Sequence, residues 1–293
     1  MERTLRHLLR PAPENESARQ RICNNEQFHK LSNPKGIALS TPSQQLSPFK
    51  SVDLPFDKEQ IEDIGFMTCM TLVLMGNYAQ TGHLGGPLSY TPYNVAVHLA
   101  GPKLGGLRFD YRRPKHPYCD KFMLAGGHCI PTCYALWMIM GEALCRKYEA
   151  TGDRRYYVDP KVTMLPIDAL GFRRGAGALA TLLQENGLAD HPLFAQAKGR
   201  GIRALAGHAE TTDVTNDVNG GPSGVGVATA AGKAAFWDVV GAPIGSPKII
   251  AFEGEFAMTE GHAQEIKTQA IALQAASGCA SSCPTTTPAS TTR

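Results

Sequence analysis

Three histidines, each in a glycine-containing turn, are the side chains of this sequence best suited to chemistry. They are His83 in Gly82–Gly86, His128 in Gly126–His128 and His208 in Gly207–Glu210. An imidazole titrates near neutral pH, so it can hydrogen-bond a phosphate oxygen or move a proton. One such histidine is more often structural, but three at the ends of elements favour a convergent site. A fourth turn, Gly221–Gly226, could bring backbone N–H groups close to an anionic or aromatic ligand.

The elements that must position these turns follow from the apolar pattern. Helical segments are expected from Asp57 to Tyr78, Tyr134 to Tyr148 and Val227 to Val240, and short strands over 122–124 and 248–252. Strand, glycine turn and helix in succession are typical of a parallel α/β sheet, whose ligands bind at the carboxyl ends of the strands. We therefore expect an α/β fold with a doubly wound, mostly parallel sheet flanked by helices.

Composition excludes several classes of protein. The 293 residues are 43% hydrophobic and 19% charged, which rules out collagen-like, disordered and disulfide-scaffold chains. The apolar runs fall far short of the ~20 residues of a membrane span, and no signal-peptide pattern is present. The net charge of +3 argues for neither nucleic acid nor an acidic membrane as partner. We expect a cytoplasmic protein with reduced cysteines. Cys129 and Cys133 lie beside His128, but no CxxC pair supports a zinc site.

Three regions differ in composition. Residues 1–55 form a polar arm, residues 56–274 carry the α/β pattern, and residues 275–293 form a low-complexity tail without large apolar side chains.

Taken in order, five segments resemble motifs of the transketolase family, which are thiamine-diphosphate enzymes. They are Thr81–Pro87 (Ser-Gly-His-Pro-Gly-Ala-Pro in the family), Asp120–His128 (Asp-Arg-Phe-Val-Leu-Ser-Asn-Gly-His), Gly207–Glu210 (Gly-His-Pro-Glu), Gly221–Gly226 (Gly-Pro-Leu-Gly-Gln-Gly) and Gly254–Gly261 (Gly-Asp-Gly-x-x-x-Glu-Gly). The resemblance covers residues 56–274. It implies a thiamine-diphosphate-binding fold that corresponds to the family's N-terminal domain and is truncated after it.

The resemblance also implies roles for individual residues. His83 would lie near the reacting carbon, His128 would contact diphosphate and substrate, and His208 would hydrogen-bond the substrate. The cofactor-binding residues would be His128, Gly221, Ser223, Gly254 and Glu255. Glu255 stands where the family has its metal-binding Asp, so it would hold Mg²⁺ or Ca²⁺. Glu260 would join the glutamate network at the family's dimer interface, which implies a homodimer.

Departures from the family pattern weaken the expected binding of cofactor and metal. Glu255 in place of Asp moves the carboxylate one methylene outward, which near-octahedral Mg²⁺ tolerates poorly. Phe256 replaces a glycine at the diphosphate, and Ser223 replaces an apolar leucine. The family's Asn-Asn pair falls in the tail, which has no asparagine. A one-base shift of the reading frame over residues 282–292 permits Asn-Asn there, so an out-of-frame tail is a further hypothesis.

The functions that remain open belong to three classes. A transketolase-like enzyme would transfer a ketol unit between sugar phosphates, but its catalytic glutamate comes from a second domain. Activity is therefore expected only if that domain, or a separate C-terminal transketolase subunit, completes the protein. The alternatives are a noncatalytic folded fragment or self-associating module, and a hydrolase acting on esters or lactones with a histidine base.

Overall fold

The computed structural model describes residues 57–112, 114–173, 175, 185, 187, 200–240, 247–254, 256–272 and 279–282. The chain divides into two compact units, Met1–Gln45 and Leu46–Arg293, and the described residues all belong to the second. The polar arm expected over residues 1–55 and the expected metal ligand Glu255 lie outside the described residues.

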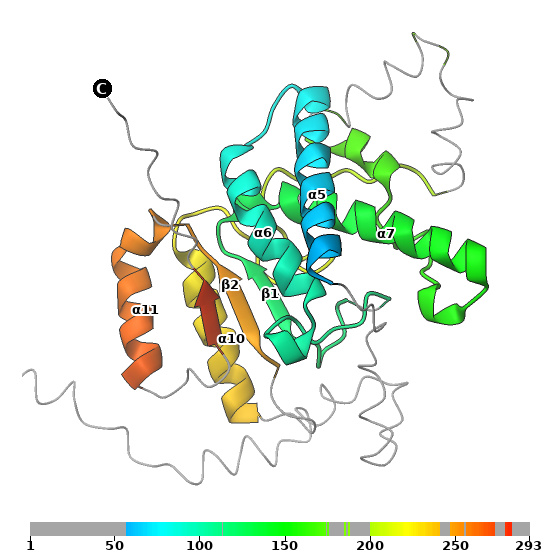
Figure 1. The fold of residues 1–293 in the computed structure, drawn as a ribbon. Helices are drawn as coiled ribbons and strands as arrows, with labels where there is room; N and C mark the ends of the chain where they lie inside the picture. The colour runs from blue at the N-terminus through cyan, green and yellow to red at the C-terminus, as the bar shows by residue number, and fades with distance from the viewer. Residues whose placement is uncertain are drawn as a thin grey trace, which may run out of the picture. The chain divides into compact units, whose positions relative to one another are not determined.

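The described strands form a three-stranded parallel sheet in the order β1-β2-β3 (Figure 1). The strands are β1 (Lys121–Leu124), β2 (Ile249–Phe252) and β3 (Cys279–Ser282). All four β2 residues are buried and apolar, as is typical of a parallel strand covered on both faces. The parallel α/β character is therefore as predicted, while the doubly wound order of a larger sheet stays a prediction.

Strand β3 lies within the segment that composition assigned to a low-complexity tail. Cys279 pairs with Ile249 and Ser282 with Phe252. Pairing in a sheet uses backbone N–H and C=O groups, which small residues also carry, so a segment without large apolar side chains can add a strand to β2.

Three helices, α5 (Lys58–Ala79), α6 (Gly85–Leu99) and α7 (Pro131–Thr151), pack on one another. Helix α5 begins where predicted, because Asp57 and Gln60 form a reciprocal capping box. Helix α6 was not predicted, and it starts inside the segment expected to be a turn. Its two N-terminal glycines and its internal Pro92 hide the helical pattern.

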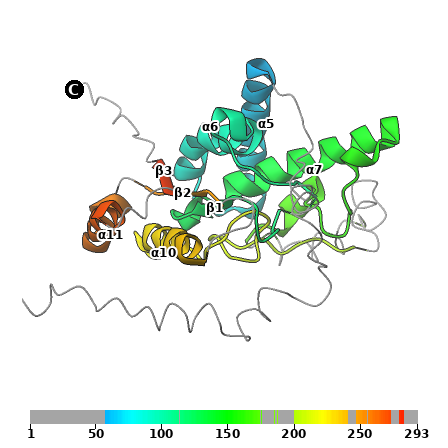
Figure 2. The same ribbon diagram turned by 90° about the horizontal axis from the view of Figure 1, so that it is seen from below.

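Helices α10 (Val225–Val240) and α11 (Gly261–Ala272) pack on each other, and α10 contacts all three strands. Figure 2 shows α6 and α10 on opposite faces of the sheet. Short 3₁₀ helices complete the described elements: η2 (Pro102–Leu104), η3 (Gly127–Cys129), η4 (Arg154–Tyr156), η5 (Pro166–Gly171) and η7 (Ala257–Thr259). Among the described helices, none combines the length and apolarity needed to cross a membrane.

His98 is a buried polar residue of the core that has hydrogen-bond partners. His98 lies among Phe109, Phe122 and Trp137, and its Nδ1 contacts the Asn94 carbonyl oxygen at 2.8 Å. Burial lowers the pKa of His98 to about 4, so this histidine is a neutral core residue.

A buried ion pair connects η5 to the segment at residue 200. Both carboxylate oxygens of Asp168 accept from the Arg200 guanidinium, at 3.0 and 2.9 Å. The same carboxylate accepts the backbone N–H groups of Leu165 and Arg203. Neither side chain of the Arg200–Asp168 pair is more than 6% exposed. The pair therefore anchors this segment to η5.

Candidate functional site

The parallel pairing of β1 and β2 brings two glycine turns to the same edge of the sheet. Leu124 at the end of β1 pairs with Phe252 at the end of β2. Gly126 N–H donates to the Phe252 carbonyl oxygen at 3.1 Å, so the two chain segments stay together beyond the strands. Residues 126–128 and 253–254 consequently meet at the carboxyl ends of the strands, where ligands bind in parallel α/β folds.

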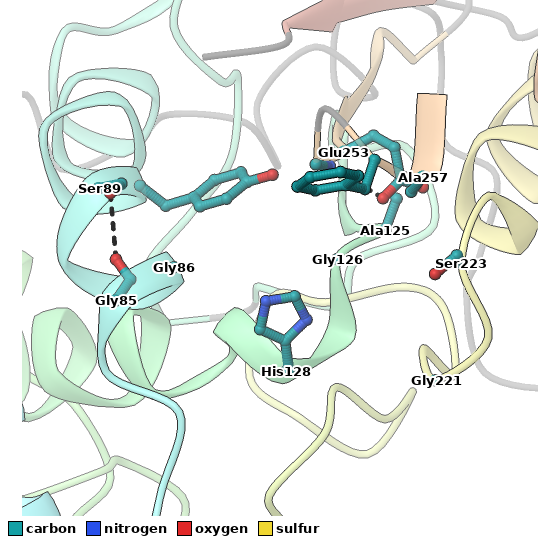
Figure 3. A pocket seen from close by; sticks show the side chains of 13 residues that line it. Gly85, Gly86, Ser89, Ala125, Gly126, His128, Gly221, Ser223, Glu253 and Ala257 are labelled. Carbon is teal, nitrogen blue, oxygen red and sulfur yellow. Dashed lines mark hydrogen bonds between the residues drawn. The ribbon is translucent and has the colours of Figure 1, made fainter. Parts of the chain in front are cut away.

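A pocket of about 370 Å³ opens at this edge (Figure 3). Helix α6, the end of β1, the 221–223 loop and the end of β2 contribute its walls: Gly85, Gly86, Ser89, Tyr90, Ala125, Gly126, His128, Gly221, Ser223, Glu253, Gly254, Phe256 and Ala257. Its volume is within the range of small-molecule sites. Of the residues predicted to bind a cofactor, His128, Gly221, Ser223 and Gly254 are among the lining residues. Phe256 is 81% exposed, so most of its ring lies in solvent.

Close backbone contacts define the shape of the pocket. A Cβ on Gly127 would lie 2.6 Å from the carbonyl carbon of Gly220, so both positions require the absence of a side chain. Ala209 connects the same segments, since its N–H donates to Gly127 and its carbonyl oxygen accepts from Gly220. A Cβ on Gly86 would lie 3.0 Å from His128 Nε2, so a side chain there would occupy the space beside that imidazole.

The three predicted histidines lie together beside this pocket. The ring centroid of His83 is 5.3 Å from that of His128 and 5.8 Å from that of His208, in edge-to-face arrangements. His128 lines the pocket itself, while His83 and His208 are exposed next to it. The structure therefore brings together the three side chains that the turn pattern singled out.

Arg173, which sequence reasoning missed, contacts this cluster. Its Nη2 lies 2.9 Å from His83 Nδ1 and 3.2 Å from the Gly207 carbonyl oxygen. Arg173 has a φ of 48°, and its N–H donates to the Leu205 carbonyl oxygen. A left-handed conformation at a non-glycine residue is uncommon, and here a long-range backbone hydrogen bond accompanies it. No local sequence signal indicates such a position.

Burial and neighbouring groups favour the neutral form of His83 and His128. Burial, then the charge of Arg173 and the proximity of His208, lower the pKa of His83. Burial, then His83 and His208, lower the pKa of His128. Because a guanidinium can only donate, the neutral His83 accepts at Nδ1 and carries its proton on Nε2. Neutral His83 and His128 can each donate a hydrogen bond from one ring nitrogen and accept a proton at the other.

Glu253 is the second functional candidate that sequence reasoning missed. It follows directly on β2, is 1% exposed and lines the pocket. Its Oε1 accepts from the Gly254 N–H at 2.9 Å, while Oε2 is buried without a hydrogen-bond partner among the described residues. Burial raises the pKa of this carboxyl, and the N–H groups of Gly254 and Gly224 partly oppose the rise. A charged residue directly after four apolar strand residues is the signal that could have revealed it.

No observation supports the binding of a metal ion by side chains of the described residues alone. Among them, no group of three His, Cys, Asp or Glu side chains is arranged to hold an ion. His128, Cys129 and Cys133 do not form such a group among the described residues. The described cysteines whose state is defined are thiols, as expected: Cys69, Cys119, Cys129, Cys133 and Cys145.

The fold and site define the chain as a parallel α/β domain with a ligand pocket at the strand ends, and solved structures with the same fold are transketolases. Transketolase from Leishmania mexicana matches at 18% identity over 76% of this chain, with a TM-score of 0.50. An arginine-to-leucine variant of transketolase from Pichia stipitis matches at 20% identity over 76% of this chain, with a TM-score of 0.51. A third match, with a TM-score of 0.50, is a Pichia stipitis transketolase variant in complex with xylulose-5-phosphate.

These matches establish a transketolase-like fold. The chain spans about a quarter of each of these transketolases, 26–27% of their length. No family model and no curated protein matches the sequence.

Proposed function

We propose that this chain is a transketolase-like domain that binds thiamine diphosphate with a divalent cation in the pocket at the ends of β1 and β2. The observation that carries the proposal is the joining of three histidines to a glycine-lined pocket at those strand ends. The ligand would engage His128, Gly221, Ser223 and Gly254. Glu255, at the family's metal position, stays a proposed metal ligand.

The pocket residues fit a phosphate-bearing cofactor in two respects. Glycines at positions 85, 86, 126, 221 and 254 let the backbone approach a ligand without interference from side chains. The carboxylate of Glu253 has an oxygen without a hydrogen-bond partner among the described residues, and Mg²⁺ commonly takes one or two carboxylates together with phosphate oxygens and water. Both features are of the kind that a cation-bound diphosphate requires.

The histidines supply the polar chemistry of the proposed site. When bound, thiamine diphosphate supplies a nucleophilic carbon that takes up a two-carbon ketol unit from a ketose phosphate. His128, on the pocket wall, would donate to a phosphate oxygen. His83, with its proton on Nε2, would donate to a substrate oxygen, and His208 would hydrogen-bond the substrate. Arg173 holds His83 in the orientation and tautomer that this role requires.

Ketol transfer would need a further domain, because the chain corresponds to about a quarter of a transketolase. We propose that a second domain or a separate C-terminal subunit completes the protein, that Glu260 contributes to a homodimer interface, and that sugar phosphates are the substrates. The proposed location is the cytoplasm. Mixing the chain with a C-terminal transketolase subunit should produce ketol transfer if this is so.

Isothermal titration of the chain with thiamine diphosphate and Mg²⁺ tests the central proposal. Saturable binding is expected, and replacing His128 by Asn should weaken it at least tenfold. His116→Asn is the matched control, because His116 lies before the N-terminal end of β1, whereas the pocket lies at the C-terminal end of that strand. Absence of binding by the unmodified chain at millimolar cofactor, or equal affinity in H128N, would contradict the proposal.

A second candidate, a self-associating module, is favoured by one surface. Five apolar side chains on α5 are substantially exposed and recur at helical spacing along one face: Phe66, Met67, Met70, Val73 and Leu74. A contiguous apolar helix face of this kind marks an interaction surface. Light scattering should show a concentration-dependent oligomer that Phe66→Ser with Leu74→Ser dissociates. Val162→Ser, at an exposed valine outside this face, is the control.

A further inference from the structure

Glu253 places an acid in a pocket whose other described lining residues include no Asp, Glu, Lys or Arg. Among the described lining residues it is the sole acidic or basic side chain apart from His128, which is held neutral. Its side chain is nearly fully buried, and the Oε2 atom lacks a hydrogen-bond partner among the described residues. A buried polar atom without a partner is costly, so it indicates a ligand that supplies one.

The charge of this acid restricts what the pocket can accept. A bare diphosphate would meet a carboxylate at close range in a site of low dielectric, which is repulsive. The described walls offer no lysine or arginine to offset that repulsion. A diphosphate that arrives with a divalent cation removes the conflict, because the cation then lies between the two anionic groups.

The surroundings of Glu253 leave Oε2 available for this purpose. The backbone N–H group of Gly254 donates to Oε1 and holds the orientation of the carboxylate. A Cβ on Gly224 would lie 2.5 Å from His262 Nε2, so α11 packs directly behind this loop. A Cβ on Gly126 would lie 3.9 Å from Glu253 Oε1, so the glycine there places no side chain against the carboxylate.

We infer that Glu253, through Oε2, is a protein ligand for the divalent cation that enters this pocket with a diphosphate group. This inference rests on the proposed function. It assigns cation binding to a residue two positions before the one that the family motif indicates, Glu255. The oxygen donor set of one carboxylate, diphosphate oxygens and water is the type that Mg²⁺ and Mn²⁺ accept.

The test measures cation binding rather than ketol transfer. Electron paramagnetic resonance would follow the binding of Mn²⁺ to the full chain with and without inorganic diphosphate. Diphosphate should raise the affinity for Mn²⁺ in the unmodified protein. Glu253→Gln should lower the affinity for the Mn²⁺–diphosphate pair at least tenfold, because an amide is a poor ligand for a hard cation. Glu149→Gln, an exposed glutamate on α7, is the control for the change in charge.

Two further measurements keep the inference falsifiable. The amide introduced by E253Q retains an oxygen that can accept the Gly254 N–H, so this variant is expected to fold, and circular dichroism checks this. Glu253→Asp keeps the charge but withdraws the carboxylate by one methylene, and it should also weaken Mn²⁺–diphosphate binding. Equal affinity in folded E253Q or E253D, or loss of binding in E255Q with retention in E253Q, would overturn the inference.

Titration with thiamine diphosphate separates the two proposals. If the chain binds the cofactor with Mg²⁺ but E253Q binds it equally well, the inference fails and the proposed function stands. If the chain binds Mn²⁺–diphosphate through Glu253 but not thiamine diphosphate, the cation site stands and the proposed function fails. Absence of both kinds of binding would overturn both.

Discussion

The guanidinium of Arg173 lies 2.9 Å from His83 Nδ1, which fixes the imidazole proton on the opposite nitrogen. This contact joins two segments ninety residues apart and places a permanent positive charge beside the histidine cluster. Arg173 is therefore a positioning residue, because it acts on the site through His83.

Replacing Arg173 by Gln should raise the pKa of His83, because the charge that disfavours the imidazolium is removed. Nitrogen-15 NMR of the imidazoles would measure both the pKa and the tautomer. Arg173→Lys retains the charge without the planar fork, so it should keep the pKa low while weakening the preference for the Nε2–H form. An unchanged tautomer and pKa in R173Q would contradict the assigned role.

Adding a methyl group at Gly86 should obstruct the pocket. Its Cβ would lie 2.6 Å from Cys129 Sγ and 3.0 Å from His128 Nε2, so the imidazole must move. We expect Gly86→Ala to weaken thiamine diphosphate binding about tenfold, equivalent to about 1.4 kcal/mol. Gly232→Ala on α10 is the matched control, because no atom lies within 4 Å of its added Cβ. Isothermal titration of both variants with thiamine diphosphate would measure the two affinities. Equal affinities of G86A and G232A would refute the expectation.

Removing the charge of Asp168 should destabilise the fold. The substitution Asp168→Asn leaves the buried Arg200 guanidinium without its counter-ion, which costs about 3 kcal/mol in comparable buried pairs. Urea denaturation followed by circular dichroism would measure the loss. Asp153→Asn is the control, since the Asp153–Arg155 pair is solvent-exposed and its loss should matter little. Equal losses in the two variants would show that the Asp168 pair does not anchor η5.

His98 should make stability depend on pH. Its folded pKa of about 4 lies below an unfolded value of about 6.5, so the unfolded chain binds the extra proton. The stabilisation is fully present above pH 6.5 and falls as the pH drops toward 4, by about 1.4 kcal/mol per unit. The free energy of unfolding, measured at several pH values, should depend less steeply on pH in His98→Gln. The same slope in both proteins would rule out this contribution.

Local sequence signals predicted the elements whose pattern is self-contained. The cap at Asp57 and the apolar period after it predicted α5, and the glycine turn before His128 predicted the end of β1. Helix α6 escaped prediction because glycine and proline obscure its start, and its stability comes from packing on α5 and α7. Strand β3 escaped because its pairing depends on the exposed edge of β2 rather than on its own side chains.

The residues of the site also fall into two groups, those that a local sequence signal reveals and those that it does not. The histidines could be found from their turns, because each turn carries glycine next to the imidazole. Glu253 and Arg173 could not, because their significance arises from contacts across the fold. Glu253 directly follows β2, which pairs with β1, and Arg173, whose N–H donates to Leu205, contacts His83 ninety residues away.

The pocket walls come from segments spread between residues 85 and 257 of the chain. Such a site contains mostly long-range contacts, which form late in folding because loop closure must precede them. The pocket is consequently complete only after β2 has paired with β1, so neither α6 nor the histidine turns can form it alone. Ligand binding would then report on the completion of folding, and a ligand present during refolding would stabilise the last step rather than the first.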